Sequence, residues 1–312
     1  MTYQLVQETG RNTYIIDGLA LNLPKRTATF ILDEKNLTLI NIGATPAVKH
    51  IKNSLIKLNS LLSRVKYIIV SDLELDSMGG VGVLLRLCPN AEVIAPKGFM
   101  QTLAEPMQLI RATRAIYGDY FSEHFEPIRP IEKDKIREVV DGDKISIGDR
   151  SLHFILPENS TYLLSFDQSR NELYTGHALG VYYDQLQDED VDLFLPSIPA
   201  SIFDLTQYRN HLNVVKELKA NAIYFNHFGK TNKVEQALNQ LNHWLELFIL
   251  ITQETIESNG NYNDLSSKFL TVVHRYLKDE NIPDNHPIYQ YIILDLNTCA
   301  LTMLNYFKKI KN

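Results

Sequence analysis

The sequence predicts a mixed α/β protein in which helices lie outside two packed β-sheets. Strand-like runs and helical patterns recur in two similar halves, and each half holds several short strands and an amphipathic helix. The region after Val234 is different, because it holds helical patterns alone. With 312 residues, of which 45% are hydrophobic and 22% are charged, the chain is long enough for a large core and one or two structural units.

The first half begins with three short runs that are rich in β-branched residues and separated by turn residues, at 13–17, 27–33 and 37–43. These runs predict an antiparallel start to the first sheet. Residues 47–62 follow with apolar side chains three and four positions apart, which predicts an amphipathic helix. The fully apolar run 65–70 then predicts a buried strand, so the local unit is strand, helix, strand.

After residue 90 come a strand, then a mixed helical stretch that ends near residue 118, and then a second half that repeats this organisation. The expected elements are strands at 91–95, 137–140, 151–156, 161–166, 172–176 and 221–229, with a helix at 201–219. We therefore expect a domain that covers residues 1–231 and a helical C-terminal extension that covers residues 232–312.

Composition and charge exclude several classes of protein. The net charge of −6, with no long basic run, argues against nucleic acid and anionic membranes as partners. Neither a signal peptide nor a membrane span is indicated, so we expect a cytoplasmic protein. Cys88 and Cys299 lie far apart in sequence, which fits a reducing compartment and argues against a cysteine-ligated zinc module.

The stretch SDLELDSMGG, residues 71–80, follows the buried strand at 65–70 and gathers three carboxylates at alternating positions. It resembles the first metal motif of the metallo-β-lactamase superfamily, in which a strand ends in Thr-His-x-His-x-Asp-His and Gly-Gly opens the next helix. Four further segments match the frame of that family: LINIG (39–43), LPENSTYLLSF (156–166), LYTGHALGVY (173–182) and IYFNHFGK (223–230). The resemblance implies a four-layer αββα sandwich over residues 1–231 with a helical extension.

The same resemblance implies seven metal-ligand positions, and most of them are substituted. The positions of the first zinc site hold Asp72, Glu74 and Asn159, whereas the family has histidines. The positions of the second site hold Asp76, Ser77 and His227, and the position of the bridging aspartate holds His177. Because imidazole nitrogen is the better ligand for zinc, a dizinc hydrolase of the family type is not expected.

Two interpretations of the acidic turn remain open. In the first, the turn is a solvated remnant and Asp76 caps the glycine-opened helix. In the second, Asp76, His177 and His227 converge as a set of two histidines and one carboxylate, with Glu74 and Asp72 nearby. Such a set suits one divalent ion of iron, manganese or zinc.

The functional prediction follows from the substituted positions. The leading expectation is a protein with a degenerate metal site that acts in binding, regulation or structure, with a small molecule or a protein as partner. The alternative is a divergent metal-dependent enzyme, either a hydrolase or an oxygen-handling non-haem iron protein. Flavodiiron proteins have a glutamate at the position of Glu74, which favours the iron version. Whether the chain is an enzyme stays open at this point.

Two further regions are candidates for binding. The aromatic stretch 115–131 falls where the family has variable loops beside its active site, so Tyr117, Tyr120 and His124 are candidates for lining a pocket. The C-terminal stretch 288–307 is apolar nearly all round, which predicts that it packs on its own domain and also contributes to a homodimer.

Overall fold

The computed structural model describes residues 4–196, 198 and 203–311, and the chain folds into two compact units. The first unit comprises Met1–Ala178 and Lys219–Asn232, and the second comprises Leu179–Leu218 and Lys233–Asn312. The predicted division at residue 231 took no account of the segment 179–218, which groups with the C-terminal helices. Each unit is described by itself below.

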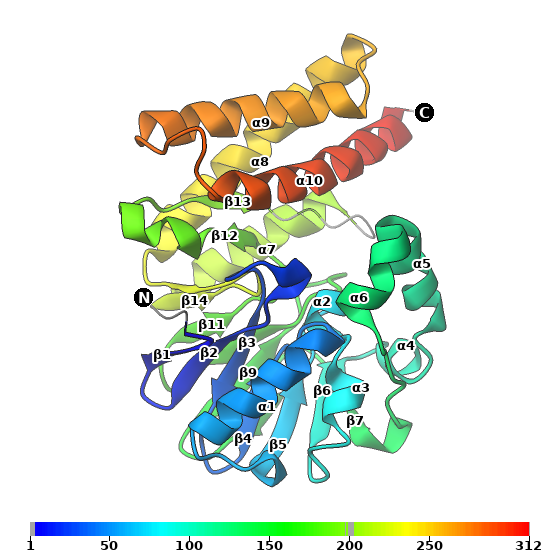
Figure 1. The fold of residues 1–312 in the computed structure, drawn as a ribbon, viewed down its shortest axis with the longest axis vertical. Coiled ribbons are helices and arrows are strands. Elements are labelled where there is room, and N and C mark those ends of the chain that lie inside the picture. The colour runs from blue at the N-terminus through cyan, green and yellow to red at the C-terminus, as the bar shows by residue number, and fades with distance from the viewer. Residues whose placement is uncertain (1–3, 197, 199–202, 312) are drawn as a thin grey trace. The chain divides into compact units, whose positions relative to one another are not determined.

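The larger sheet of the first unit has seven strands in the order β1-β2-β3-β4-β5-β6-β7 (Figure 1). Its strands are β1 (Val6–Gly10), β2 (Thr13–Asp17), β3 (Ala28–Leu32), β4 (Leu37–Ile40), β5 (Val65–Ile69), β6 (Glu92–Pro96) and β7 (Ile136–Val139). Neighbouring strands are antiparallel from β1 to β4 and parallel from β4 to β7. The antiparallel start predicted from the sequence is confirmed.

The second sheet has six strands in the order β15-β14-β11-β10-β9-β8. Its strands are β8 (Lys144–Ser146), β9 (Ser151–Ile155), β10 (Leu164–Asp167), β11 (Glu172–Tyr174), β14 (Ala222–Tyr224) and β15 (Lys230–Thr231). β11 and β14 are parallel neighbours, so both end at the same edge of the sheet. This edge matters because two of the predicted site residues directly follow these strands.

The two sheets pack face to face through a shared apolar core. Phe30 of the first sheet contacts the rings of Tyr174 and Tyr224 of the second, with centroids 5.3 and 5.4 Å apart. Side chains from both inner faces complete this cluster, and all of them are almost fully buried. Burial of aromatic and branched side chains at this density is the main source of stability for such a sandwich.

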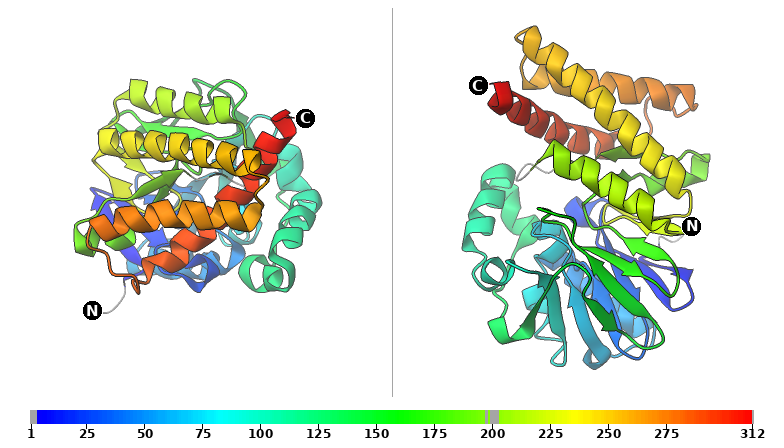
Figure 2. Two further views of the ribbon diagram at one scale, coloured as in Figure 1. Left: turned by 90° about the horizontal axis from the view of Figure 1, so that it is seen from above. Right: turned by 180° about the vertical axis from the view of Figure 1, so that it is seen from behind.

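Helices cover the outer face of the seven-stranded sheet (Figures 1 and 2). They are α1 (Val48–Lys57), α2 (Leu75–Met78), α3 (Val81–Leu84), α4 (Met100–Ala104), α5 (Met107–Tyr117) and α6 (Phe121–Phe125). Ile51 and Leu55 of α1 pack on the same buried cluster as Ile68 of β5. The apolar stripe predicted for this segment therefore faces the sheet, which is the arrangement that an amphipathic helix requires.

The second unit is mainly helical. It consists of β12 (Gly180–Tyr182), β13 (Phe194–Pro196), α7 (Leu205–Leu218), α8 (Val234–Glu257), α9 (Tyr262–Asp279) and α10 (Ile288–Lys311). Phe248 of α8 stacks on Phe269 of α9 with ring centroids 4.2 Å apart. The predicted helical C-terminal extension is thus present. Across the described residues, no helix combines the length and apolar character needed to span a bilayer.

Several boundaries differ from the expected ones. The first long helix ends at Lys57 rather than at residue 62, because Asn59 adopts a left-handed backbone with φ of 53°. The expected strand 221–229 is confined to β14, and the chain turns later, at Phe228, where φ is 48°. The start of the expected helix 201–219, residues 201 and 202, lies outside the described residues. The short strands β1, β8, β12, β13 and β15 have no clear signal in the sequence.

The homodimer stays a prediction, and α10 offers the surface for it. Ile293, Leu294 and Leu301 are 41, 39 and 43% exposed, which is unusual for branched apolar residues on one helix. We expect light scattering of the wild type to give about twice the chain mass of 35.8 kDa. The double variant with Leu294→Glu and Leu301→Glu should give the mass of one chain. Leu250→Glu on α8, at a residue 56% exposed, is the control that keeps the wild-type mass. A monomeric wild type would contradict the prediction.

Candidate metal site

The candidate site forms where three strands of the first unit end. The turn with Asp72 and Asp76 follows β5, His177 follows β11, and His227 follows β14. β11 and β14 are held in register beyond their ends, because Thr175 donates its backbone N–H to the carbonyl of Tyr224 at 3.1 Å. Side chains far apart in sequence therefore meet at one edge, which is how strand ends of α/β folds commonly build sites.

Gly176 brings the two sheets into contact at this edge. Its φ is +55°, a conformation that side-chain-bearing residues adopt at a cost. A Cβ at this position would lie 2.3 Å from Ser71 Oγ and 3.0 Å from Asp72 Oδ2. Only glycine permits this approach, and it fixes the distance between the acidic turn and the neighbouring His177.

Three ligand-capable atoms form a compact triangle at the centre of the site. His177 Nε2 and His227 Nε2 are 3.0 Å apart. Asp76 Oδ2 lies 3.2 Å from His227 Nε2 and 3.5 Å from His177 Nε2. Among the histidine, cysteine, aspartate and glutamate residues that the structure describes, this is the group whose geometry suits a metal ion. The side chain of Asp76 is 28% exposed, whereas those of His177 and His227 are 4 and 10% exposed, so solvent reaches the triangle at Asp76.

Asp72 is not part of the triangle and contacts the second ring nitrogen of His177, Nδ1. Its Oδ2 atom lies 3.1 Å from His177 Nδ1 and accepts a hydrogen bond from Ser71 Oγ at 2.6 Å. Its Oδ1 atom accepts from the backbone N–H of Glu74 at 3.2 Å. This buried carboxylate therefore has a partner on both oxygens, and the resulting turn fixes the backbone that leads to Asp76.

A chain of hydrogen bonds assigns the tautomer of His177. The backbone N–H of Ser71 can only donate, and it points at Asn41 at 3.1 Å, so that atom of Asn41 is the amide oxygen. Asn41 then donates its Nδ2 to Asn226 Oδ1 at 3.0 Å, which leaves Asn226 Nδ2 as a donor 3.0 Å from His177 Nε2. Nε2 is therefore the acceptor, and Nδ1 carries the proton toward Asp72.

The electrostatics of the site favour positive charge at His177. Burial alone would lower the pKa of His177, but the carboxylates of Asp72 and Asp76 raise it well above its usual value. Burial also acts on both carboxylates by raising their pKa, yet the neighbouring histidine charge and hydrogen bonds outweigh it and lower them. Burial and the charge of His177 lower the pKa of His227, which stays neutral.

The hydrogen bonds and the electrostatics favour different protonation states of His177 Nε2. The carboxylates stabilise a positive charge near His177 Nε2, whereas the N–H group of Asn226 faces that same nitrogen and disfavours a proton on it. The direction of the Asn226 bond is anchored by a backbone donor, so we take the bare Nε2 as the state that the surroundings select. Any cation at Nε2, a proton or a metal ion, would use the lone pair that accepts from Asn226 Nδ2, so this hydrogen bond would have to be given up when it binds.

The remaining predicted ligand positions lie outside the triangle. The backbone carbonyl of Glu74 receives the N–H groups of Ser77 and Met78 at the start of α2. Ser77 Oγ lies 3.1 Å from His177 Nδ1 and accepts from Asn226 Nδ2 at 3.2 Å, so it supports the histidine. Asn159 lies in the turn between β9 and β10, where its φ is 60°.

The interpretation of Asp76 as a helix cap is wrong. Asp76 lies inside α2, four residues before Gly80, and neither α2 nor α3 has a side-chain cap. The carboxylate is held by the two histidines instead. The pair Gly79–Gly80 separates two short helices rather than opening one long helix.

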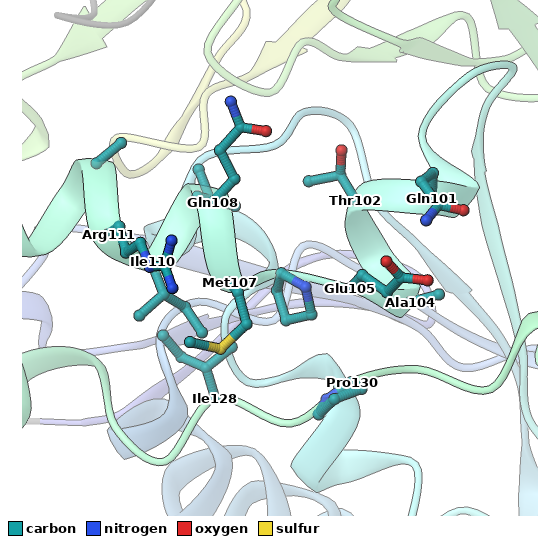
Figure 3. A pocket seen from close by; sticks show the side chains of 13 residues that line it. Gln101, Thr102, Ala104, Glu105, Met107, Gln108, Ile110, Arg111, Ile128 and Pro130 are labelled. Carbon is teal, nitrogen blue, oxygen red and sulfur yellow. The ribbon is translucent and has the colours of Figure 1, made fainter.

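The aromatic candidates lie in and beside α5 and α6. Tyr117 packs edge-on against Phe125 with centroids 4.8 Å apart, and the exposed Tyr120 stacks on His124 at 6.4 Å. A surface hollow of about 990 Å³ lies nearby and is lined by α4, the first part of α5 and residues 128 and 130, among them Met107 and Arg111 (Figure 3). None of the three aromatic candidates lines this hollow, and their role in binding stays a prediction.

Sequence reasoning missed the residues that orient the site. Asn41, Ser71 and Asn226 were not singled out, although each is polar and directly follows an apolar strand. That position is the signal that would have found them, because a polar side chain at a buried strand end needs partners.

Comparison with solved structures agrees with this architecture. A protein from Burkholderia ambifaria described as a beta-lactamase domain protein aligns with a TM-score of 0.62 and 13% identity, over 98% of this chain and 88% of that one. A metallo-beta-lactamase family protein from Thermus thermophilus aligns with a TM-score of 0.60 and 17% identity, over 89% and 93%. The chain has the metallo-β-lactamase fold.

An archaeal protein of the metallo-beta-lactamase superfamily from Sulfolobus tokodaii also has this fold, with a TM-score of 0.60 and 21% identity over 74% of this chain and 86% of that one. The four-layer fold class and the helical C-terminal extension predicted from the sequence are confirmed. No family model matches the sequence. No curated protein matches it either. At such low identity the likeness to solved structures concerns the fold alone, and the chemistry has to be inferred from the site.

The chain of amide hydrogen bonds predicts a stability effect. Asn41→Ala should lower the free energy of unfolding by about 1–3 kcal/mol, because the backbone N–H of Ser71 and the amide oxygen of Asn226 lose their buried partner. Asn90→Ala is the matched control, since Asn90 is exposed and donates to a surface carbonyl, and it should change stability by less than about 0.5 kcal/mol. Urea unfolding measures both, and equal effects would show that the amide chain does not stabilise the fold.

Proposed function

We propose that the protein binds a single divalent metal ion through Asp76, His177 and His227 and uses it to hydrolyse a small substrate. The observation that carries the proposal is the triangle of donor atoms, with sides of 3.0, 3.2 and 3.5 Å. Bonds of about 2.0–2.1 Å place neighbouring ligands about 3.0 Å apart in an octahedron and about 3.4 Å apart in a tetrahedron. The three sides span this interval, so one ion can contact all three atoms with little movement.

The surroundings of His177 support the same conclusion. A metal-bound histidine usually donates its other ring N–H to a carboxylate or a carbonyl, which fixes its orientation and increases its basicity. Asp72 occupies that place, 3.1 Å from His177 Nδ1. The bare Nε2 atom that Asn226 selects is also the form of histidine that binds metals.

A second ion has no comparable set of ligands. Asp72 already accepts hydrogen bonds from Ser71, Glu74 and His177, and it would have to give up at least one of them to bind a metal. The oxygen donors at the remaining positions of the first family site are weaker ligands for zinc than imidazole. This favours a mononuclear centre over the dizinc centre that the fold suggests.

The chemistry follows from the donor set. When bound, the ion would lower the pKa of a water molecule and polarise a carbonyl or phosphoryl oxygen. Two imidazoles and one carboxylate suit iron, manganese or zinc and leave positions open for water and substrate. Burial and the charges of Glu74, Asp72 and Asp76 raise the pKa of the Tyr162 phenol well above its usual value.

A second candidate function is a binding or regulatory protein that works without metal. The observation in its favour is that the site balances its own charges, since His177 lies between Asp72 and Asp76 with contacts of 3.1 and 3.5 Å. A protonated His177 would hold both carboxylates together. In that case the fold would be retained as a scaffold, and the partner would be a small molecule or a protein.

Elemental analysis of the purified protein separates the two functions. We expect about one equivalent of iron, manganese or zinc per chain, with loss of most of it in Asp76→Ala and in His227→Ala. His153→Ala, which changes a histidine on β9, is the matched control and should retain the metal. Ester, thioester and phosphodiester substrates are assayed with the same samples. A fully folded wild type that binds no added metal would contradict the proposal and favour the metal-free function.

The role of Asp72 gives a sharper test. Asp72→Asn keeps the shape of the side chain but weakens its hold on the His177 N–H, so metal affinity should fall about 10- to 100-fold. Glu74→Gln is the matched control, because this carboxylate is not part of the triangle, and its affinity should stay within about twofold of wild type. Competition with a chromophoric chelator measures both constants. Equal affinity in wild type and Asp72→Asn would show that Asp72 does not support the metal site.

A further inference from the structure

Buried amide side chains link the two sheets and end at the candidate metal site. Asn41 follows β4 of the first sheet and Asn226 follows β14 of the second, and both are fully buried. Asn41 Nδ2 donates to Asn226 Oδ1 at 3.0 Å, and Asn226 Nδ2 lies 3.0 Å from His177 Nε2. The protein itself therefore occupies the lone pair through which His177 would bind a metal ion.

Asn226 cannot remove this donor by flipping its amide group. A flip would bring Asn226 Nδ2 to the place of its Oδ1 atom, 3.0 Å from Asn41 Nδ2, and two donors would then face each other. Asn41 cannot flip to compensate, because its Oδ1 atom accepts from the backbone N–H of Ser71 at 3.1 Å. A backbone group at the end of β5 thus keeps the N–H of Asn226 directed at the histidine.

The two residues that form this hydrogen bond are also held in place by other contacts. The backbone N–H of Asn226 donates to the carbonyl of Gly176 at 3.3 Å, and its carbonyl accepts from the N–H of Ala28 at 2.9 Å. His177 is held at its second ring nitrogen, because Nδ1 lies 3.1 Å from Asp72 Oδ2. Neither partner can move away without disturbing a further hydrogen bond, so separating Asn226 Nδ2 from His177 Nε2 costs free energy.

We infer that Asn226 lowers the affinity of the site for divalent metal ions, because an ion can bind His177 Nε2 only after the Asn226 N–H group has given up this acceptor. The inference rests on the proposed function and concerns the regulation of metal binding at the same site. Ser77 Oγ, 3.2 Å from Asn226 Nδ2, remains the acceptor for one N–H of the amide, whereas the other loses its bond. This cost arises in the protein, so it is the same for every metal ion.

The experiment measures the dissociation constants of Zn²⁺ and of Mn²⁺ for the full-length protein by competition with a chromophoric chelator. Asn226→Ala removes the donor, and Asn226→Leu removes it while keeping most of the side-chain volume. Ser77→Ala is the matched control, because it changes a buried partner of the same amide and leaves the donor at His177 Nε2. Thermal unfolding shows which variants are folded, and Asn226→Leu decides the test if Asn226→Ala does not fold.

We expect both Asn226 variants to bind Zn²⁺ and Mn²⁺ about tenfold more tightly than wild type, which corresponds to about 1.4 kcal/mol. The factor should be the same for the two ions, because the lost hydrogen bond belongs to the protein. Ser77→Ala should bind no more tightly than wild type. Damage to the fold would weaken metal binding, so a gain in affinity identifies the effect of the donor.

The possible results separate this inference from the proposed function. If wild type binds metal and the folded Asn226 variants bind it equally well, the inference fails while the proposed function stands. A gain confined to one of the two ions, or an equal gain in Ser77→Ala, also overturns the inference. If wild type binds no added metal but an Asn226 variant does, the proposed function fails and the inference stands. Absence of binding in every folded form overturns both.

Discussion

The polar centre of the protein depends on the hydrogen bond from the backbone N–H of Ser71 to Asn41. This N–H group cannot rotate or change its role, so it fixes which end of the Asn41 amide is oxygen. Asn41 then donates to Asn226 Oδ1, so Asn226 Nδ2 is the donor that faces His177 Nε2. Ser71 also approaches Gly176, where any Cβ would collide with its hydroxyl. One strand end thereby sets both the position and the chemical state of a histidine that follows another strand.

The fixed orientation bears on the charge state of His177, which lies at the centre of the candidate site. The two carboxylates around His177 stabilise positive charge, but the Asn226 amide disfavours a proton at the nitrogen that faces the centre. Buried polar groups that lack a matching partner cost about 1–3 kcal/mol each. A proton or a metal ion on Nε2 would therefore leave the Asn226 N–H group without its acceptor. The competing metal-free state remains accessible because the charges of Asp72, Asp76 and His177 compensate one another.

The fold was largely predictable because its signals are local. The spacing of apolar residues is enough to predict the strand at 65–70 and the helix after residue 47. The convergence of Asp76, His177 and His227 followed from a resemblance in the turns after three strands. The direction of the Asn226 amide and the left-handed backbone of Leu19 and Leu21 in the loop after β2 were not predictable, because both depend on contacts between distant segments. Segment 179–218 groups with the C-terminal helices through packing, which its sequence pattern does not indicate.

The backbone at the site is fixed independently of the three candidate ligands. The backbone at the site is held by Gly176, by the Asp72 turn and by the contacts of strands β11 and β14, and none of these requires the side chains that would bind a metal. A substitution at a ligand position therefore alters the donor set and leaves the positions of the other donors in place. This is why likeness of fold at 13–21% identity does not determine chemistry. The reaction has to be inferred from the donors that are present, and here these are two imidazoles and one carboxylate.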